Sequence, residues 1–202
     1  MAGTAATSGD DIATLVDPRR WLVLAVVLAA PLLAIFDQFV VNVAIATMQR
    51  DLGASFGQIQ LVVAGYALAY AVLLITGGRL GDIRGRKRTF ILGLGGFTVA
   101  SALCGLAPTP EFLIAARVLQ GCAAALMSPQ TLAIIRVTFP GREQSTAFAI
   151  YGMVLGLAGV LGQVVGGLLI RANLFGLTWR PIFLINLPVG IVATVAAIFL
   201  LR

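Results

Sequence analysis

Six apolar stretches constrain this chain more than any other feature of its sequence. They span residues 21–48, 59–78, 89–107, 112–139, 145–170 and 182–201. An α-helix needs roughly 20 apolar residues to cross the hydrocarbon core of a bilayer, which is about 30 Å thick. The sequence therefore predicts an all-α membrane protein with six transmembrane helices.

The composition excludes most other classes of protein. Charged residues make up 11% of the 202 positions and hydrophobic residues 59%, whereas a soluble domain carries about 25% charged residues. A water-soluble enzyme, a disordered tail and a nucleic-acid module are therefore excluded. The chain has no His, and Cys104 and Cys122 lie in apolar runs without metal-ligand spacing, so we expect no metal site and interpret both cysteines as small buried hydrophobic residues.

The first 20 residues differ from the rest of the chain. Residues 1–20 are rich in Ala, Gly, Ser, Thr and Asp, which predicts a flexible tail before a transmembrane domain over residues 21–202. A signal peptide is the alternative interpretation of the first apolar stretch, but its apolar core would be about 7–15 residues long. Residues 21–36 already form 16 uncharged residues, and the apolar run resumes after Asp37 and Gln38. We therefore interpret this stretch as a helix of the mature protein.

Basic residues fall into alternate connections. Ten of the 14 Lys and Arg residues lie in the tail, in the second-to-third and fourth-to-fifth connections, and at Arg202. Cytoplasmic loops of membrane proteins carry such an excess of Lys and Arg. We expect a multi-pass protein of the plasma membrane with both termini in the cytoplasm, and we assign the net charge of +6 to this topology rather than to nucleic-acid binding.

Small residues recur at helical spacing, which allows close helix packing in lipid. The fifth stretch contains Gly152 and Gly156, followed by a ridge of Ala158, Gly162 and Gly166. The pair Gly77-Gly78 near the end of the second stretch has a counterpart in Gly166-Gly167 of the fifth. This correspondence predicts two inverted three-helix repeats, as found in transporters.

Two charged residues, Asp37 and Arg117, fall within the predicted spans. From the helix rise, Asp37 lies about 24 Å and Arg117 about 21 Å above the inner face, so we expect the two charges to share one level and to pair. A charge inside the membrane indicates a site for a proton or substrate, with a purely structural ion pair as the alternative. Gln38 and Asn42 extend the polar face around Asp37, and Gln120 follows Arg117 at helical spacing.

The second-to-third connection carries the most specific pattern in the chain. Residues 78–85 read Gly-Arg-Leu-Gly-Asp-Ile-Arg-Gly, directly before Arg86, Lys87 and Arg88. Gly78 and Gly85 permit tight turns, and Asp82 can cap a helix or pair with Arg86. A plain basic loop explains the arginines but leaves the glycines and the acid without a reason.

The pattern of residues 78–85 resembles the loop motif of the major facilitator superfamily, and the resemblance to that family extends over about residues 21–201. Residues 36–44 (Phe-Asp-Gln-Phe-Val-Val-Asn-Val-Ala) are similar to the first-helix motif of its fourteen-helix drug:proton antiporter branch. Residues 117–121 resemble the fourth-helix motif, and residues 179–190 (Trp-Arg-Pro-Ile-Phe-Leu-Ile-Asn-Leu-Pro-Val-Gly) the start of the sixth helix. The chain departs from the fifth-helix motif, where a proline follows the central glycine; here Gln163 follows Gly162, before Gly166 and Gly167.

The resemblance implies one six-helix half of a transporter that exports drugs or other amphipathic small molecules in exchange for protons, with the proton gradient in place of a cofactor. By this resemblance Asp37 is the proton switch, and the motif of Gly78, Asp82, Gly85 and Arg86 is a cytoplasmic gate. Gln38, Asn42, Arg117 and Gln120 would face the substrate cavity. Two alternatives remain: a non-transporting fragment or half, and a facilitator or importer of another solute.

We also expect a second six-helix unit as a partner. Alternating access needs two bundles that rock about a site between them. The polar face of Asp37, Asn42, Arg117 and Gln120 is expected to meet lipid unless another unit covers it.

Overall fold

The computed structural model describes residues 18–201 and confirms six helical spans that are long and apolar enough to cross a membrane. The predicted tail lies almost entirely outside the described residues. The helices are α2 (Arg20–Leu52), α3 (Phe56–Arg84), α4 (Arg86–Gly105), α5 (Pro110–Thr138), α6 (Gly141–Ala172), the short 3-10 helix η1 (Leu174–Gly176), α7 (Pro181–Leu184) and α8 (Asn186–Leu200). The helices α7 and α8 together form the sixth span.

Local side-chain chemistry marks the helix ends. Ser55 and Gln58 form a reciprocal capping box at the start of α3, and the Thr109 hydroxyl accepts from the Phe112 N–H at the start of α5. These side chains satisfy N–H groups that have no partner within the helix. The break between α7 and α8 lies one turn before Pro188, which has no N–H to donate to the Leu184 carbonyl.

The second-to-third connection differs from the predicted loop. The helix α3 continues to Arg84 and α4 begins at Arg86, so only Gly85 separates them. Gly85 has a φ of 95°, which a glycine adopts without steric cost. Gly78 and Asp82 are helical, so the expected turn at Gly78 is wrong. The prediction was based on hydropathy, which shows only where the apolar span ends. The helix continues beyond that point because Arg is a good helix former.

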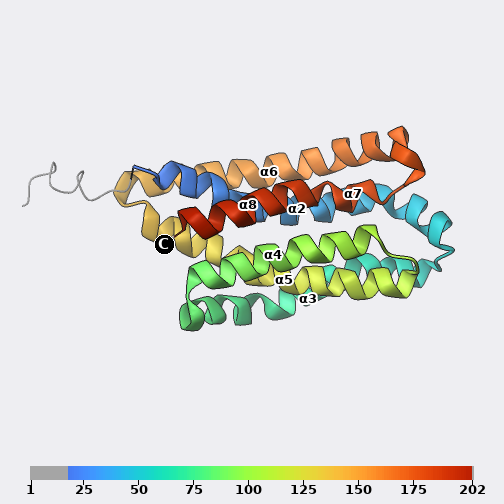
Figure 1. Cartoon of the computed structure of the whole chain (residues 1–202), viewed down its shortest axis with the longest axis horizontal. Helices are drawn as coiled ribbons and strands as arrows, with labels where there is room; N and C mark the ends of the chain where they lie inside the picture. Colours follow the sequence, from blue (N-terminus) through green and yellow to red (C-terminus); the bar gives the residue numbers. More distant parts are fainter. Residues whose placement is uncertain (1–17, 202) are drawn as a thin grey trace, which may run out of the picture.

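The helices pair symmetrically between the two halves of the chain. The first helix of each three-helix unit packs on the second helix of the other: α2 on α6, and α5 on α3. The third helices, α4 and α8, also contact each other. Figure 1 shows α6 along one edge of the bundle and α3 along the opposite edge. This pairing of helices between the two three-helix units is expected of an inverted repeat, as the glycine correspondence predicted.

The two glycine pairs behave alike in the structure. A Cβ on Gly77 would lie 2.2 Å from the Ala125 carbonyl oxygen, and one on Gly166 would lie 2.7 Å from Val40 Cγ2. The second member of each pair has room, because Gly78 meets its nearest atom at 3.7 Å and Gly167 meets nothing within 4 Å. The first glycine of each pair is therefore the one that permits close packing.

The predicted ridge of small residues on the fifth span is confirmed, whereas the glycine pair before it makes no close contact. Ala158, Gly162 and Gly166 are buried, and Gly162 packs against the backbone of Phe36. Gly152 and Gly156 are exposed, and neither would meet an atom within 4 Å if it carried a Cβ. Gly152 and Gly156 therefore make no close contact with another of the six described helices.

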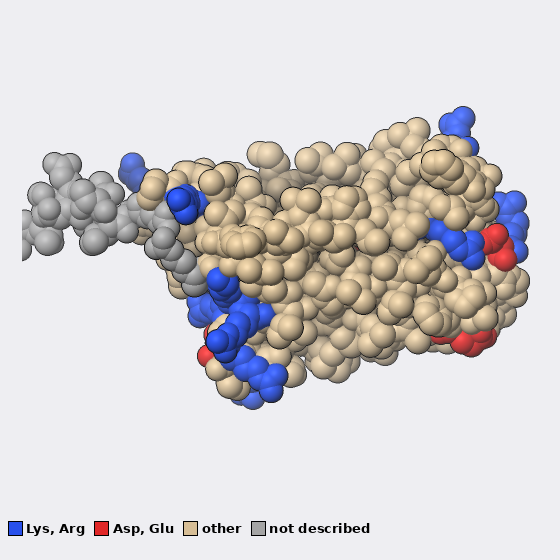
Figure 2. Space-filling model, viewed as in Figure 1, with Lys and Arg blue, Asp and Glu red and all other residues tan. Residues whose placement is uncertain are grey.

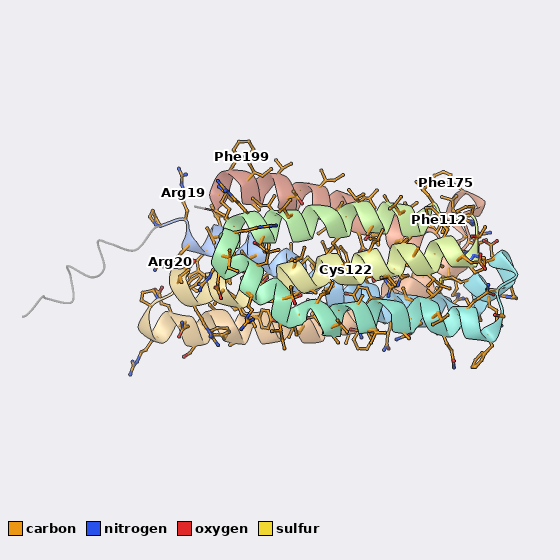
Figure 3. The ribbon with its side chains drawn as sticks, turned by 90° about the horizontal axis from the view of Figure 1, so that it is seen from below. Arg19, Arg20, Phe112, Cys122, Phe175 and Phe199 are labelled. Carbon is orange, nitrogen blue, oxygen red and sulfur yellow. The ribbon has the colours of Figure 1, made fainter. Side chains whose placement is uncertain are left out.

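Basic residues gather at the end of the bundle where α2 begins, α3 meets α4, and α5 meets α6. Figure 2 shows Lys and Arg concentrated at this end, whereas the opposite end carries acidic residues beside arginines. Figure 3 places Arg19 and Arg20 at the basic end and Phe112 and Phe175 at the other, with Phe199 pointing away from the bundle. Both ends of the described residues lie at the basic end (Figure 1). The predicted alternation of charge is thus reproduced in space.

Candidate functional site

Asp37 of α2 and Arg117 of α5 form an ion pair inside the bundle. The carboxylate Oδ2 accepts a hydrogen bond from Arg117 Nη1. The side chain of Asp37 is 0% exposed and that of Arg117 is 1% exposed. The helix rise predicted the common level of these two residues, and the structure brings them into direct contact.

Amide groups complete the shell around the carboxylate. Asp37 Oδ1 accepts from Gln120 Nε2 at 2.9 Å and from Asn186 Nδ2 at 3.1 Å. Both amides also donate to Ser101 Oγ, at 2.8 and 3.5 Å respectively. Gln120 Oε1 accepts from Arg117 Nη1 at 2.7 Å. Four helices (α2, α4, α5 and α8) therefore meet in one hydrogen-bond network, hereafter the Asp37 network.

Arg117 is held on its other sides by a backbone carbonyl and two rings. Its Nε donates to the Val62 carbonyl at 3.2 Å. The guanidinium carbon lies 4.3 Å from the centroid of the Tyr66 ring and 5.7 Å from that of Phe183. Such cation–π contacts stabilise a desolvated cation. The Tyr66 hydroxyl in turn donates to the Ala34 carbonyl at 3.3 Å, which fixes the ring.

The Asp37 network fits a charged carboxylate. Every group in hydrogen-bond contact with Asp37 presents an N–H to it. A buried ion pair is weak evidence for stability, because desolvation of both charges offsets their attraction. A purely apolar packing would hold these helices at least as well. A buried charge pair inside a membrane-spanning bundle therefore calls for a reason other than stability alone.

The structure does not gather all predicted site residues in one place. Asp37, Arg117 and Gln120 join in the Asp37 network, whereas Gln38 and Asn42 are exposed on another face of α2. Adjacent positions on an α-helix point about 100° apart, so Gln38 cannot share the face of Asp37. The expectation that Asp37, Arg117 and Gln120 would meet lipid is also wrong, because the six helices bury all three.

Three members of the site were not predicted from the sequence: Ser101, Asn186 and Tyr66. Asn186 lies within the sixth-helix motif but was not among the predicted site residues. The sequence does mark Asn186, because it is an amide inside an apolar span, two positions before a proline that interrupts the helix. Ser101 gave no comparable signal, because a serine hydroxyl inside a span commonly bonds the backbone of its own helix. Tyr66 gave none because its ring is an ordinary component of an apolar span.

The predicted gate residues lie at the basic end, away from the Asp37 network. Asp82 and Arg86 form an exposed ion pair at 3.5 Å, and Arg86 Nη1 also donates to the Ala133 carbonyl of α5. Gln130 Nε2 donates to the Gly77 carbonyl at 2.8 Å. The motif therefore ties the α3–α4 junction to α5. On α6, Gln163 is exposed beside the buried Gly162.

A second polar cluster joins the end of α2 to two connections at the opposite end of the bundle. Asp51 Oδ2 accepts from Trp179 Nε1 and from Arg180 Nη1, both at 2.8 Å. Arg180 Nη2 also donates to the Ala107 carbonyl at 3.3 Å. This cluster fixes the start of α7, and therefore the position from which Asn186 reaches Asp37.

Six membrane-spanning helices, paired between two three-helix units around a buried charge pair, define a domain of the kind from which secondary transporters are built. The profile of the Major Facilitator Superfamily matches residues 18–202. The chain belongs to the Major Facilitator Superfamily, as its motifs predicted, and it is an integral membrane protein.

Several curated relatives are named for antibiotics. The chain is 51% identical over 183 residues to a probable actinorhodin transporter of Streptomyces coelicolor, with 91% of this chain and 32% of that protein covered. It is 46% identical to a puromycin resistance protein of Streptomyces alboniger, with 88% and 35% covered. It is 39% identical to a tetracenomycin C resistance and export protein of Streptomyces glaucescens, with 91% and 33% covered. The chain thus spans about a third of the length of these relatives.

Solved structures share the fold. A bacterial homologue of the human lysosomal transporter Spinster, in an inward-facing and occupied conformation, superposes with a TM-score of 0.81 at 25% identity. That match covers 92% of this chain and 45% of the solved one. A peptide transporter with bound sulfate superposes with a TM-score of 0.76 at 15% identity, which shows the fold alone.

Proposed function

We propose that this chain is one six-helix half of a proton-coupled exporter of drugs or other amphipathic small molecules. The observation that carries the proposal is the fully buried Asp37–Arg117 pair with its shell of amide donors. The names of the relatives, which include resistance and export proteins, support the substrate class and the direction. In this proposal the chain is not an enzyme, and the proton gradient takes the place of a cofactor.

Asp37 is the proton switch in this mechanism. Proton uptake by Asp37 removes its negative charge and therefore its attraction to Arg117, which couples the proton to a movement of α2 against α5. Gln120 moves with Arg117, because both lie on α5 and share a hydrogen bond.

The site for the exported molecule lies between this unit and a second six-helix unit. Gln38 and Asn42 face it from α2, where they are exposed at membrane depth. The partial coverage of the relatives supports the need for that second unit. Asp82, Arg86 and their neighbouring glycines Gly78 and Gly85 form the gate on the cytoplasmic side, where both termini lie. The protein acts in the plasma membrane.

A transport assay in inverted membrane vesicles tests the proposal. In the complete transporter that contains this chain, acidifying the vesicle lumen should drive accumulation of a fluorescent cationic dye inside the vesicles. A protonophore should abolish that accumulation. A facilitator would equilibrate the dye with or without the pH gradient, and an importer would empty the vesicles, so either result would reject proton-coupled export.

A further inference from the structure

Asn186 has one buried hydrogen-bonding atom that the arrangement around Asp37 leaves unused. Its Nδ2 donates to Asp37 Oδ1 at 3.1 Å and to Ser101 Oγ at 3.5 Å. Its Oδ1 is buried and has no hydrogen-bond partner among the described residues. The residue as a whole is 1% exposed. A buried acceptor without a donor costs free energy, and such atoms in native proteins usually have a reason.

A proton on Asp37 changes what its neighbours must provide. The neutral acid carries an O–H that needs an acceptor. Arg117 has only donors, and Gln120 Oε1 already accepts from Arg117 Nη1 at 2.7 Å and from Cys104 Sγ at 3.6 Å. Among the side chains bonded to Asp37, Asn186 alone has an acceptor that is not yet occupied.

The amide of Asn186 can meet both protonation states. A half-turn about its Cβ–Cγ bond exchanges Oδ1 and Nδ2, which occupy nearly the same volume. One orientation presents Nδ2 to a carboxylate, and the other presents Oδ1 to an acid. The hydroxyl of Ser101, which accepts from Nδ2 in the first orientation, can donate to Oδ1 in the second.

We propose that Asn186 is a positioning residue that reverses its hydrogen bond to Asp37 when Asp37 takes up a proton. This inference rests on the proposed function of Asp37. The proton comes from water and resides on Asp37 Oδ1, while Asn186 neither gains nor loses one. The charged or titratable groups that face Asp37 are Arg117 of α5, Tyr66 of α3 and Cys104 of α4; within the described residues α6, α7 and α8 contribute none.

The position of Asn186 gives this reversal a mechanical consequence. Asn186 is the first residue of α8, at the break between α7 and α8, where Pro188 removes one helical hydrogen bond. One turn further on, Gly190 packs so closely on α4 that a Cβ there would lie 2.1 Å from Thr98 Oγ1. A change in the bond to Asp37 therefore acts where the sixth span lacks one helical hydrogen bond, next to the close contact of Gly190 with α4.

Infrared difference spectroscopy with isotope-labelled asparagine tests the reversal in the 202-residue chain reconstituted in lipid nanodiscs. The protein has three asparagines, Asn42, Asn173 and Asn186. Asn42 and Asn173 are exposed and serve as internal controls. During a pH titration, the amide carbonyl band of one asparagine should shift at the same midpoint at which the carboxylic-acid band of Asp37 appears. Asn186→Leu should remove that amide band, and Asp37→Leu should remove the acid band and the shift.

The midpoint itself separates a reversing amide from a fixed donor. A fixed donor stabilises only the carboxylate, so Asn186→Leu would raise the midpoint by about one pH unit or more, a roughly tenfold change in proton affinity. A reversing amide bonds to both forms, so the same variant should shift the midpoint by much less. The wild-type spectra alone decide the case if either variant fails to fold.

Two outcomes would overturn the inference, and they are distinguishable. An Asp37 acid band that titrates while the Asn186 band stays constant would reject the reversal and leave the proposed function standing. The absence of an Asp37 acid band at every pH at which the protein stays folded would reject both.

Discussion

At the scale of single residues, Arg117 shows how a charge becomes compatible with the interior of a membrane bundle. The guanidinium bonds to Asp37, to Gln120 and to the Val62 carbonyl, and it lies against the face of Tyr66. Only a planar group with several donors can make these contacts together. The identity of the cation therefore matters here as well as its charge.

Arg117→Lys should destabilise the protein by about 1–3 kcal/mol, because an ammonium cannot reach both the Asp37 carboxylate and the Val62 carbonyl. Denaturant-induced unfolding of the purified protein in detergent measures this. The control is Arg20→Lys, at a partly exposed ion pair with Glu143, where a loss of about 1 kcal/mol or less is expected. Equal losses for the two variants would show that the buried contacts of Arg117 have no special weight.

At the scale of helices, the glycines that matter are those that face a partner backbone. Gly77 lies where α3 crosses α5, whereas a Cβ on its neighbour Gly78 would meet its nearest atom at the ordinary contact distance of 3.7 Å. The two positions have the same residue and lie in the same turn of the same helix. They therefore separate the effect of close packing from the general effect of glycine on a helix.

Gly77→Ala should destabilise the protein by about 1–3 kcal/mol, since the added Cβ would overlap the Ala125 carbonyl oxygen and backbone atoms cannot rotate away. Gly78→Ala should leave the stability unchanged or raise it by about 0.5–1 kcal/mol, because alanine is the better helix former. Thermal unfolding of both variants in one detergent measures the difference. A Gly77→Ala variant as stable as Gly78→Ala would contradict the packing described for α3 and α5.

The same scale shows what the sequence can and cannot predict. Apolar length predicted six spans, and the helix rise predicted that Asp37 and Arg117 lie at one level, because each of these quantities depends on distances along individual helices. The continuation of α3 through Arg79 and Arg84 was not predicted, since hydropathy reports the membrane core rather than the helix end. The contact of Asn186 with Asp37 joins residues 149 positions apart, and no local pattern encodes such a contact.

At the scale of the whole molecule, the six helices bury their central charge pair but leave amides and glycines of α2 and α6 uncovered. Gln38 and Asn42 on α2, and Gly152, Gly156 and Gln163 on α6, are exposed. The faces of α4 and α8 instead expose apolar side chains such as Leu92 and Phe199, which suit lipid. These exposed polar and small residues, rather than Asp37, are therefore the reason to expect a second unit against α2 and α6.

Cysteine crosslinking in native membranes tests which face meets a second six-helix unit. In a protein with Cys104 and Cys122 replaced by alanine, Gly156→Cys should crosslink to that unit, because the site is open and small. Phe199→Cys, on the apolar face, should react with a lipid-soluble reagent and form no crosslink. Crosslinks from Phe199→Cys alone would place the partner against α8 and contradict this arrangement.

The central claim is that Asp37 couples the proton to transport, and the Asp37→Asn variant of the complete transporter tests it most directly. Asparagine has the shape of the protonated acid and cannot release a proton. Arg117 keeps its bonds to Gln120 and the Val62 carbonyl, so the fold should persist. In inverted vesicles the variant should lose all accumulation driven by the pH gradient while still exchanging labelled dye for unlabelled dye across the membrane. Accumulation against the gradient at the wild-type rate would show that Asp37 is not the switch.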